Sequence, residues 1–297
     1  MRAAYIEEFG GRDQLQVGDV AAPPLLPDGV RIAIRAAGVN PVDWKTREGR
    51  QAQRFPHAFP VVLGWDAAGV VEEVGPSVTR VRPGDEVWAY CRKHFVGEGT
   101  YAEQVVVPQE FVSFKPDSLS FEEAAAVPLA ALTAWQCLTE KLELAAGETV
   151  LVPAASGGVG HFAVQIAGAL GARAIGTASA RNEEFVHGLG AEFLDYARGE
   201  LPEHVDAAID PLGGDSLEAL KRVADRVVSI VQPGDGHRYH YVRPDGIQLD
   251  GLTRLVDERR LRPHVQEVLP LAEVARAHEL LEDGHVRGKL VLAIRPR

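Results

Sequence analysis

The residues that most clearly point to chemistry form a glycine-rich turn. Thr149–Pro153 is typical of a buried strand, a turn of small residues follows, and Gly158–Leu170 has the pattern of an apolar helix. Backbone N–H groups in such a turn approach a pyrophosphate closely, and the helix N-terminus adds partial positive charge. A second strand at Arg173–Thr177 completes the context of a dinucleotide site. We predict that the cofactor contacts Ala155, Ser156, Gly157, Gly158 and Val159. The alternative is that these glycines serve only tight packing of strand on helix.

The end of the second strand indicates which dinucleotide binds. NAD sites usually carry Asp or Glu there, bound to the ribose 2′-hydroxyl. This chain has no acid between Gly176 and Glu183, but it offers the Ser179 hydroxyl and the Arg181 guanidinium, which suit a 2′-phosphate. NADP(H) is therefore the predicted cofactor, unless Arg181 is an ordinary solvated residue at a helix start.

Cysteine usage argues against a thiolate metal site. Cys91 and Cys137 are the only cysteines and show no CxxC spacing, so a disulfide framework and a cysteine-based structural zinc site are excluded. The histidines include no HxxxH pair beside an acid. A reducing compartment is favoured, and we predict no metal ligands.

The expected strands and helices around these residues follow two different sequence patterns. The first part of the chain consists of short extended runs punctuated by Gly and Pro, which is typical of an antiparallel β domain. These runs are Val30–Ala36, Gly69–Val74, Glu86–Tyr90 and Ala102–Pro108. Ser120 and Glu123 then form a capping-box pattern at a helix start, and Pro128 divides the following Ala-rich stretch into two helices.

Beyond Gly147 strands and helices alternate, which predicts a doubly wound parallel sheet with helices on both faces. The expected elements continue with helix Asn182–Leu189, strand Val205–Asp210, helix Asp215–Arg222, strand Arg226–Val231, strand Tyr239–Val242 and helix Gly246–Arg260. A helix at Leu271–Glu282 and a strand at Lys289–Ile294 close the chain. The fold class is therefore α/β, with a Rossmann domain beside a mainly antiparallel β domain.

Composition and charge limit the function classes. The 297 residues are 46% hydrophobic and 25% charged, which is ordinary for a globular chain of about two domains. A net charge of −11 disfavours general binding to nucleic acid. The acids near the N-terminus do not suit a secretory signal, and no apolar run is long enough to span a membrane. We expect a cytoplasmic protein that binds neither nucleic acid nor membrane.

The order of several motifs resembles the medium-chain dehydrogenase/reductase superfamily, and within it the zinc-free quinone oxidoreductase and enone reductase branch. The segments that carry the resemblance span nearly the whole chain and include residues 38–45, 59–66, 81–87, 99–103, 154–160 and 189–191, with Gly288 and Lys289 near the end. The resemblance implies a split GroES-like catalytic domain at 1–119 and 264–297. An NADP-binding Rossmann domain at 120–263 is inserted into it, and the active site is expected in the cleft between the two.

The resemblance also carries site residues over to this chain. It implies that Thr133 lies beside the nicotinamide, that Tyr196 packs near the 2′-phosphate, and that the backbone of Tyr241 and Val242 meets the nicotinamide amide. Lys289 is assigned to the cofactor site as well. Each of these residues has a simple structural role as its alternative. Zinc-dependent relatives carry a Cys and a Gly-His-Glu triplet, whereas this chain has Asn40 and Trp65-Asp66. A catalytic zinc ion therefore lacks its usual ligands.

Without a metal ion, the hydride acceptor must be electrophilic on its own, as quinones and α,β-unsaturated carbonyls are. The predicted catalytic residues are Asn40, Asp43 and Lys45. Asn40 can donate its amide to a carbonyl or near the nicotinamide ribose, and Asp43 can orient Lys45. Lys45 can then donate to a developing enolate. The alternative is a surface ion pair between Asp43 and Lys45 in a loop. Lys in place of the Tyr of many quinone reductases favours activated alkenes.

These features predict a zinc-independent oxidoreductase that transfers hydride from NADPH to a quinone or α,β-unsaturated carbonyl compound. Two alternatives stay open, an enoyl-thioester or polyketide-type enoyl reductase and a non-catalytic NADPH-binding protein. The expected partner is a small-molecule quinone or enone. The resemblance also implies a homodimer, in which the edge strand at Tyr239–Val242 pairs with its copy.

Overall fold

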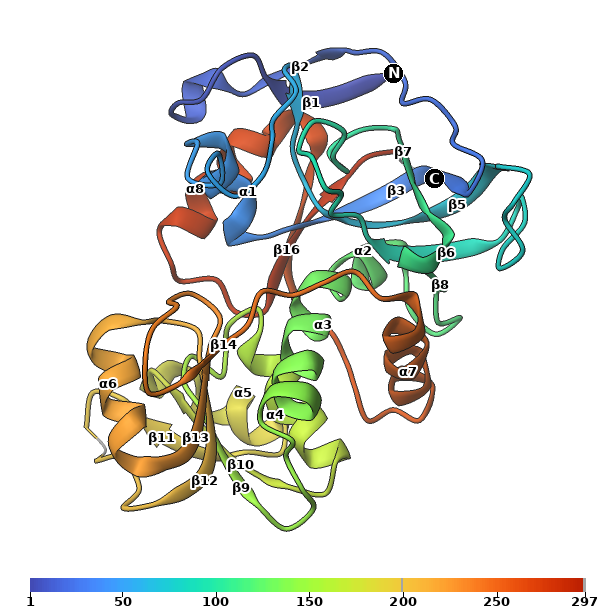
Figure 1. The fold of residues 1–297 in the computed structure, drawn as a ribbon. Helices are drawn as coiled ribbons and strands as arrows, with labels where there is room; N and C mark the ends of the chain where they lie inside the picture. The colour runs from blue at the N-terminus through green and yellow to red at the C-terminus, as the bar shows by residue number, and fades with distance from the viewer. Residues whose placement is uncertain (199, 296–297) are drawn as a thin grey trace. The chain divides into compact units, whose positions relative to one another are not determined.

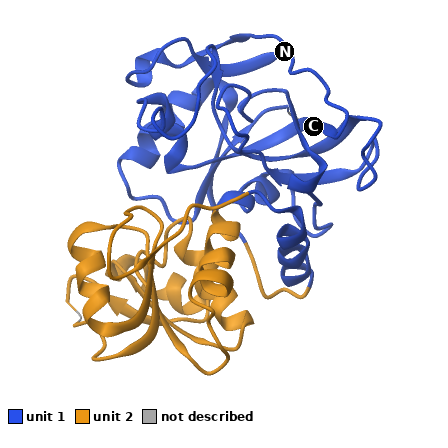
Figure 2. Cartoon of the chain, viewed as in Figure 1, with its two compact units in different colours: residues 1–129, 244–257, 263–297 blue, residues 130–243, 258–262 orange. Residues whose placement is uncertain are grey.

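The computed structural model describes residues 1–198 and 200–295 and divides into two compact units, shown in Figure 2. Unit 1 comprises Met1–Leu129, Pro244–Asp257 and the chain from Pro263 onward. Unit 2 comprises Ala130–Arg243 and Glu258–Arg262. The mixture of an antiparallel sheet in unit 1 and a parallel sheet in unit 2 confirms the predicted fold class.

Unit 1 is built around a mainly antiparallel sheet whose centre is the long strand β3 (Gly29–Val39). Alternate residues of β3, such as Val30, Ile32 and Ile34, are fully buried in the core, which is the period of a strand with one buried face. The sheet runs in the order β15-β16-β3-β5-β6-β8, and β7 also pairs with β3. The bounds are β15 Val265–Pro270, β16 Lys289–Ala293, β5 Asp66–Val74, β6 Glu86–Tyr90, β7 Gln104–Pro108 and β8 Val112–Phe114.

Smaller elements complete unit 1. A second sheet has the order β2-β1-β4, with β2 at Gln16–Asp19, β1 at Arg2–Ile6 and β4 at Val61–Val62. The helices are α1 (Pro41–Arg47), α2 (Phe121–Ala125), α7 (Gly246–Asp257) and α8 (Val274–Glu282). The capping box predicted at Ser120 and Glu123 is confirmed at the start of α2, where each side chain bonds the other residue's backbone N–H.

Unit 2 contains a parallel sheet in the order β11-β10-β9-β12-β13-β14 (Figure 1). The strands are β9 Thr149–Val152, β10 Arg173–Ala178, β11 Glu192–Asp195, β12 Val205–Asp210, β13 Ala224–Ser229 and β14 Arg238–Tyr239. The helices α4 (Gly160–Ala169), α5 (Glu183–Gly188) and α6 (Gly214–Val223) connect them, and α3 runs over Pro128–Gln136 from the predicted break. The chain moves from β9 toward β11 and then from β12 toward β14. Crossovers of one hand therefore place α4 and α5 on one face and α6 on the other.

The unit boundaries differ from the predicted domain boundaries at 120 and 263. Helix α7 was expected in the Rossmann domain, but it packs on β8 in unit 1. Arg80 donates to Val112 O at 2.7 Å and to Asp250 Oδ2 on α7 at 2.5 Å. Gly246 begins α7, where an added Cβ would lie 2.5 Å from Val112 O, so only glycine allows this close approach.

Several strands lie outside the elements expected from the sequence. β4, β11 and β15 were not among the predicted strands; β4 has only two residues, and β15 carries a bulge between Val265 and Glu267. Across the residues that the structure describes, no helix combines the length and the apolar character needed to cross a lipid bilayer.

Candidate active site

The glycine-rich turn of unit 2 follows β9, the strand at which the order of the parallel sheet changes direction. β10 and β11 lie on one side of β9, and β12, β13 and β14 lie on the other. Ligands of open parallel sheets bind outside the carboxyl ends of the strands at such a switch point. The predicted residues Ala155 to Val159 all lie in the turn between β9 and α4, which is the position a dinucleotide requires.

Local geometry in the turn fits a pyrophosphate. Ala154 adopts a left-handed backbone with φ 50°, and the Ala155 N–H donates to Thr177 O at 2.9 Å. A Cβ on Gly160 would lie 2.2 Å from Ala154 O, so only glycine lets α4 start so close to the turn. No side chain caps the N-terminus of α4. The His161 N–H donates to Gly157 O at 3.1 Å, and the partial positive charge at this end of the helix favours an anion.

The ends of β10 and β11 bring together the residues predicted to select the dinucleotide. Ser179 is half-buried and accepts a hydrogen bond from Asn182 Nδ2 at 3.2 Å, and Arg181 is exposed on the short helix that follows β10. The side chain of Tyr196 is 68% exposed, and its N–H donates to Ala178 O at 3.3 Å. Ser179, Arg181 and Tyr196 therefore share one edge of the sheet.

The sheet register also reveals an acid that reading one strand at a time misses. Asp195 lies opposite Ala178 in the parallel pairing of β11 with β10. One carboxylate oxygen of Asp195 accepts the Ala197 N–H at 3.0 Å, so this acid stabilises its own turn. Residues that follow two neighbouring strands, rather than one, therefore lie together at this edge.

The other predicted cofactor residues of unit 2 lie near the end of β14 and on α3. Thr133 is buried on α3. Tyr241 is half-buried and Val242 buried, but both lie beyond β14, which is shorter than the predicted strand Tyr239–Val242. Their placement in a connecting segment means that their backbone groups are not all used by the sheet ladder.

A side-chain clamp that the sequence did not predict holds this connecting segment. Gln136 Oε1 lies 3.0 Å from His240 Nε2 and accepts the Arg243 N–H at 3.1 Å. Gln136 Nε2 donates to Arg243 O at 3.0 Å. Burial and the positive charge of Lys141 lower the pKa of His240 to about 4. The neutral imidazole therefore joins α3 to the segment that contains Tyr241 and Val242.

A second set of side-chain hydrogen bonds joins the carboxyl ends of β12 and β13. Ser229 Oγ donates to Asp210 Oδ2 at 2.6 Å, and Asp210 Oδ1 accepts the N–H groups of Leu212 and Gly213 at 3.1 and 2.8 Å. Asp210 and Ser229 are both fully buried. They fix the turns beside the glycine-rich turn without offering a group to a ligand.

In unit 1 the segment predicted as a loop at Asn40–Lys45 is a helix start instead. Pro41 occupies the first turn of α1, where a missing N–H costs nothing. Asp43 Oδ2 accepts the Asn40 N–H at 2.7 Å. The acid therefore caps its own helix, and its N-terminal neighbours are fixed by a regular element rather than by a loop.

The Asn40 side chain belongs to a buried polar network. Its Nδ2 donates to Asp66 Oδ2 at 2.8 Å, and its Oδ1 accepts a hydrogen bond from Lys289 Nζ. Lys289 Nζ also donates to Val39 O at 3.0 Å and lies 3.9 Å from Asp66 Oδ2. These contacts of Lys289, which was predicted to bind cofactor, all lie within unit 1.

Two carboxyl groups in this network have pKa values that burial raises well above the usual range. Burial raises the pKa of Asp43 to about 7, although hydrogen bonds from Tyr101 and from the Asn40 backbone oppose the rise. Burial likewise raises the pKa of Asp66 to about 6, opposed by the Lys289 ammonium. Tyr101 Oη donates to Asp43 Oδ2 at 2.8 Å, whereas Asp43 Oδ1 is buried without a hydrogen bond. The sequence did not indicate the contribution of Tyr101.

The prediction that Asp43 orients Lys45 is wrong. The two residues are two positions apart on a helix, so their side chains do not face each other. Asp43 points into the buried network, while Lys45 is half-exposed with Nζ 5.5 Å from the Trp44 ring centre. Partial burial, followed by the positive charge of Arg50, lowers the pKa of Lys45. This lowered pKa is compatible with a role in proton donation, which stays a prediction.

The polar groups around Asn40 bond to one another and are not arranged as metal ligands. Asn40 and Asp66 are bonded to each other and to Lys289, and the Trp65 side chain is buried against Phe55 and Tyr90. Within residues 1–198 and 200–295, no cluster of three or more His, Cys, Asp or Glu is arranged to hold a metal ion.

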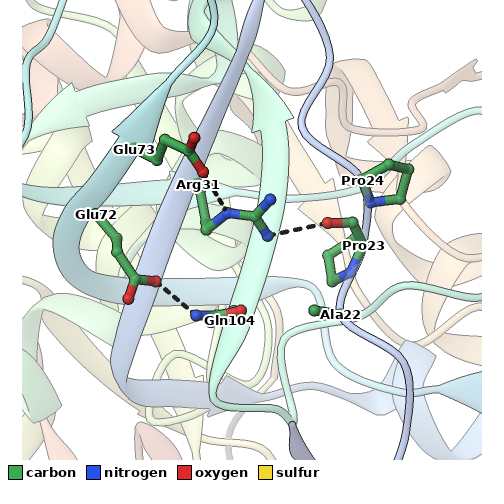
Figure 3. A pocket seen from close by; sticks show the side chains of 7 residues that line it. All are labelled: Ala22, Pro23, Pro24, Arg31, Glu72, Glu73 and Gln104. Atoms are coloured by element: carbon green, nitrogen blue, oxygen red, sulfur yellow. Dashed lines mark hydrogen bonds and ion pairs between the residues drawn. The ribbon is translucent and has the colours of Figure 1, made fainter.

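An open hollow on unit 1 has a different character. It measures about 630 Å³ and is lined by Ala22, Pro23, Pro24, Arg31, Glu72, Glu73 and Gln104 (Figure 3). Arg31 bonds Glu73 at 3.2 Å and Pro23 O at 2.9 Å, and Gln104 bonds Glu72 at 2.6 Å. Each charged group in this hollow already bonds a polar neighbour, so the hollow lacks the features described for the turn and the Asn40 network.

Comparison with known proteins adds an independent observation. The family model "alcohol dehydrogenase GroES-like domain" matches residues 26–117, and the model "zinc-binding dehydrogenase" matches residues 189–292. The chain is 33% identical to a mitochondrial NAD(P)H oxidoreductase of Danio rerio over 99% of this chain and 91% of that protein. It is 32% identical to a chloroplastic NADPH-dependent alkenal/one oxidoreductase of Arabidopsis thaliana over 98% of this chain and 79% of that protein. The quinone oxidoreductase of Coxiella burnetii shares its structure with a TM-score of 0.89 and 34% identity over 99% of both chains.

Proposed function

Because the chain belongs to the medium-chain dehydrogenase/reductase superfamily and is an oxidoreductase by its relatives, we propose that it transfers hydride from NADPH to a quinone or an α,β-unsaturated carbonyl compound without a metal ion. The observation that carries this proposal is the donor set around Asn40. At the positions where zinc-dependent relatives hold ligands, this chain has an amide bonded to Asp66 and Lys289 and a buried indole. An acceptor that needs no Lewis acid follows from that replacement.

The residues of unit 2 that would hold NADPH are the uncapped turn from Ala155 to Val159 and the polar edge formed by Ser179, Arg181 and Tyr196. When bound, the nicotinamide supplies the hydride. The turn binds the pyrophosphate through backbone N–H groups, and Arg181 and Ser179 bind the 2′-phosphate. The names of the Danio rerio and Arabidopsis thaliana relatives support a nicotinamide cofactor.

The residues of unit 1 act on the acceptor. Asn40 donates a hydrogen bond from Nδ2, and Lys45 donates from Nζ to the oxygen on which negative charge develops. The lowered pKa of Lys45 makes its ammonium group a stronger acid, which favours proton transfer to the developing enolate. The name of the alkenal/one oxidoreductase relative supports an activated alkene as the acceptor, and that of the Coxiella burnetii protein supports a quinone.

A panel of acceptors tests the proposal. Purified protein is mixed with NADPH or NADH and with a quinone, an enone, an enoyl thioester and a simple ketone, and loss of the reduced nicotinamide absorbance is followed. We expect turnover of the quinone or the enone with NADPH, and none of the ketone. Turnover of the ketone alone, or of no acceptor, would contradict the proposal.

A further inference from the structure

We propose that Lys289 and Asp66 are positioning residues that fix the orientation of the Asn40 carboxamide, so that one hydrogen of Nδ2 is presented to the acceptor. This inference rests on the proposed function only in assigning that hydrogen to the acceptor. It reassigns Lys289 from cofactor binding to the support of Asn40.

The orientation of the amide follows from the chemistry of its two partners. An ammonium group has donors and no acceptor, so Lys289 Nζ can bond only the oxygen of Asn40. A carboxylate has acceptors and no donor, so Asp66 Oδ2, at 2.8 Å, can bond only the nitrogen. Both partners specify the same orientation of a side chain whose oxygen and nitrogen otherwise exchange places easily.

The two partners are themselves held by backbone. Lys289 is the first residue of β16, and its Nζ also donates to Val39 O at 3.0 Å. Asp66 is the first residue of β5, and its Oδ1 accepts the Leu129 N–H at 2.7 Å. Lys289, Asn40 and Asp66 are at most 3% exposed. Water therefore cannot replace either partner of the Asn40 amide.

Asn40 uses three atoms in this arrangement. Its backbone N–H donates to Asp43 Oδ2, its Oδ1 accepts from Lys289, and one hydrogen of Nδ2 goes to Asp66. Nδ2 carries two hydrogens, so one donor remains beyond the network. The hydrogen bond that Oδ1 accepts from Lys289 polarises the amide, which makes that remaining hydrogen a stronger donor.

The experiment compares Lys289→Met with Lys289→Arg, because arginine also donates without accepting. Protein labelled with ¹⁵N in its asparagine side chains reports the Asn40 amide directly, and Asn40→Asp identifies its signals by their absence. We expect slow hydrogen exchange of the Asn40 Nδ2 signals in the wild type and in Lys289→Arg. We expect at least about tenfold faster exchange in Lys289→Met.

Binding and kinetics separate positioning from cofactor contact. Lys289→Met is expected to lower kcat/KM for the acceptor about 10²-fold, within the usual range for a transition-state hydrogen bond. NADPH affinity, measured by fluorescence, is expected to stay within about twofold, and Lys289→Arg is expected to recover at least a tenth of the rate. A parallel loss of NADPH affinity, or unchanged Asn40 signals in Lys289→Met, would overturn the inference.

A matched control is available in the same unit. Lys115 is also a buried lysine that donates to backbone carbonyls, at Pro116 and Leu119, and pairs with Glu86 at 3.1 Å. Lys115→Met should lower stability without changing the Asn40 signals or the acceptor kinetics, and a change in both would overturn the inference. If the wild type reduces no quinone or enone, the proposed function fails, and the Asn40 exchange rates still decide whether Lys289 positions the amide.

Discussion

The polar residues of unit 1 bond to one another, whereas the predicted binding residues of unit 2 consist of backbone groups and exposed side chains. Asn40, Asp66 and Lys289 are buried and mutually bonded before any ligand arrives. Arg181 and Tyr196 are exposed, and the N-terminus of α4 has no cap. The arrangement in unit 1 is therefore preorganised by folding, while that in unit 2 is completed by its ligand.

This difference separates stability from binding. A substitution in the unit 1 network removes a partner from a buried charge, and the cost appears in the free energy of unfolding. A substitution at the exposed edge of unit 2 leaves the fold unchanged and appears in cofactor affinity.

The largest expected effect is on stability and comes from Asp66→Ala. The substitution removes the buried carboxylate that faces the Lys289 ammonium and accepts the Leu129 N–H. Removing one partner of a buried charged pair typically costs about 3–5 kcal/mol. Urea unfolding should show a loss of that size, whereas Ser179→Ala in unit 2 should change stability by less than about 0.5 kcal/mol. Equal small losses in both variants would remove the contrast.

The next effect is on catalysis and comes from Lys45→Met. If Lys45 donates to the developing enolate, kcat and kcat/KM should fall together by about 10²–10³-fold. An enone should lose more than a quinone, because a quinone anion is already delocalised. NADPH affinity should not change. Wild-type rates with both acceptors would show that Lys45 is a surface residue.

Cofactor selection in unit 2 should respond to Arg181→Ala. Loss of a charge-assisted hydrogen bond typically costs about 1.5–3 kcal/mol, so NADPH binding should weaken roughly tenfold to a hundredfold. NADH binding should stay nearly unchanged, and so should the urea midpoint. The assignment of Arg181 to the 2′-phosphate fails if both dinucleotides lose affinity equally.

Features that neighbouring residues determine could be predicted from the sequence, whereas contacts between distant residues could not. The glycine-rich turn, the Ser120–Glu123 cap and the helix start at Pro128 involve neighbours in sequence, and all three were predicted. The bond between Lys289 and Asn40 joins residues 249 positions apart, and Tyr101 reaches Asp43 across 58. No local pattern indicates such contacts, and the first of them depends on the pairing of β16 with β3.

The helix at Asn40–Lys45 illustrates a second limit. Asn followed by Pro is as typical of a turn as of a helix start, and α1 is a helix of only Pro41–Arg47. Reading the segment as a loop allowed Asp43 and Lys45 to meet, which a helix forbids. Tertiary burial of Asp43, Thr46 and Arg47 decides the outcome.

Opposite responses to pH provide a smaller test of the contrast. The folded pKa of Asp43 is raised to about 7, so the folded state holds a proton that the unfolded chain releases from about pH 4. Its contribution to stability is present below pH 4 and is lost as pH rises toward 7. The pKa of His240 in unit 2 is lowered to about 4, so its contribution is gained as pH rises from 4 toward 6.5. Urea midpoints of Asp43→Asn should fall less than those of wild type between pH 5 and 8, and those of His240→Gln should rise less between pH 4 and 6.5. Parallel pH profiles for wild type and both variants would contradict these assignments.

The smallest effect concerns assembly. β14 lies at the edge of the parallel sheet of unit 2, and an edge strand pairs readily with a copy of itself. We expect a homodimer at micromolar concentration by light scattering. A monomeric mass over that range would contradict the predicted dimer.

Turnover in protein stripped of metal tests directly whether hydride transfer needs a metal ion. The protein is treated exhaustively with a chelator, its zinc content is determined, and reduction of a quinone and an enone is followed with NADPH. We expect unchanged turnover in protein that contains no stoichiometric zinc. Turnover that disappears on chelation and returns only with Zn²⁺ would contradict it.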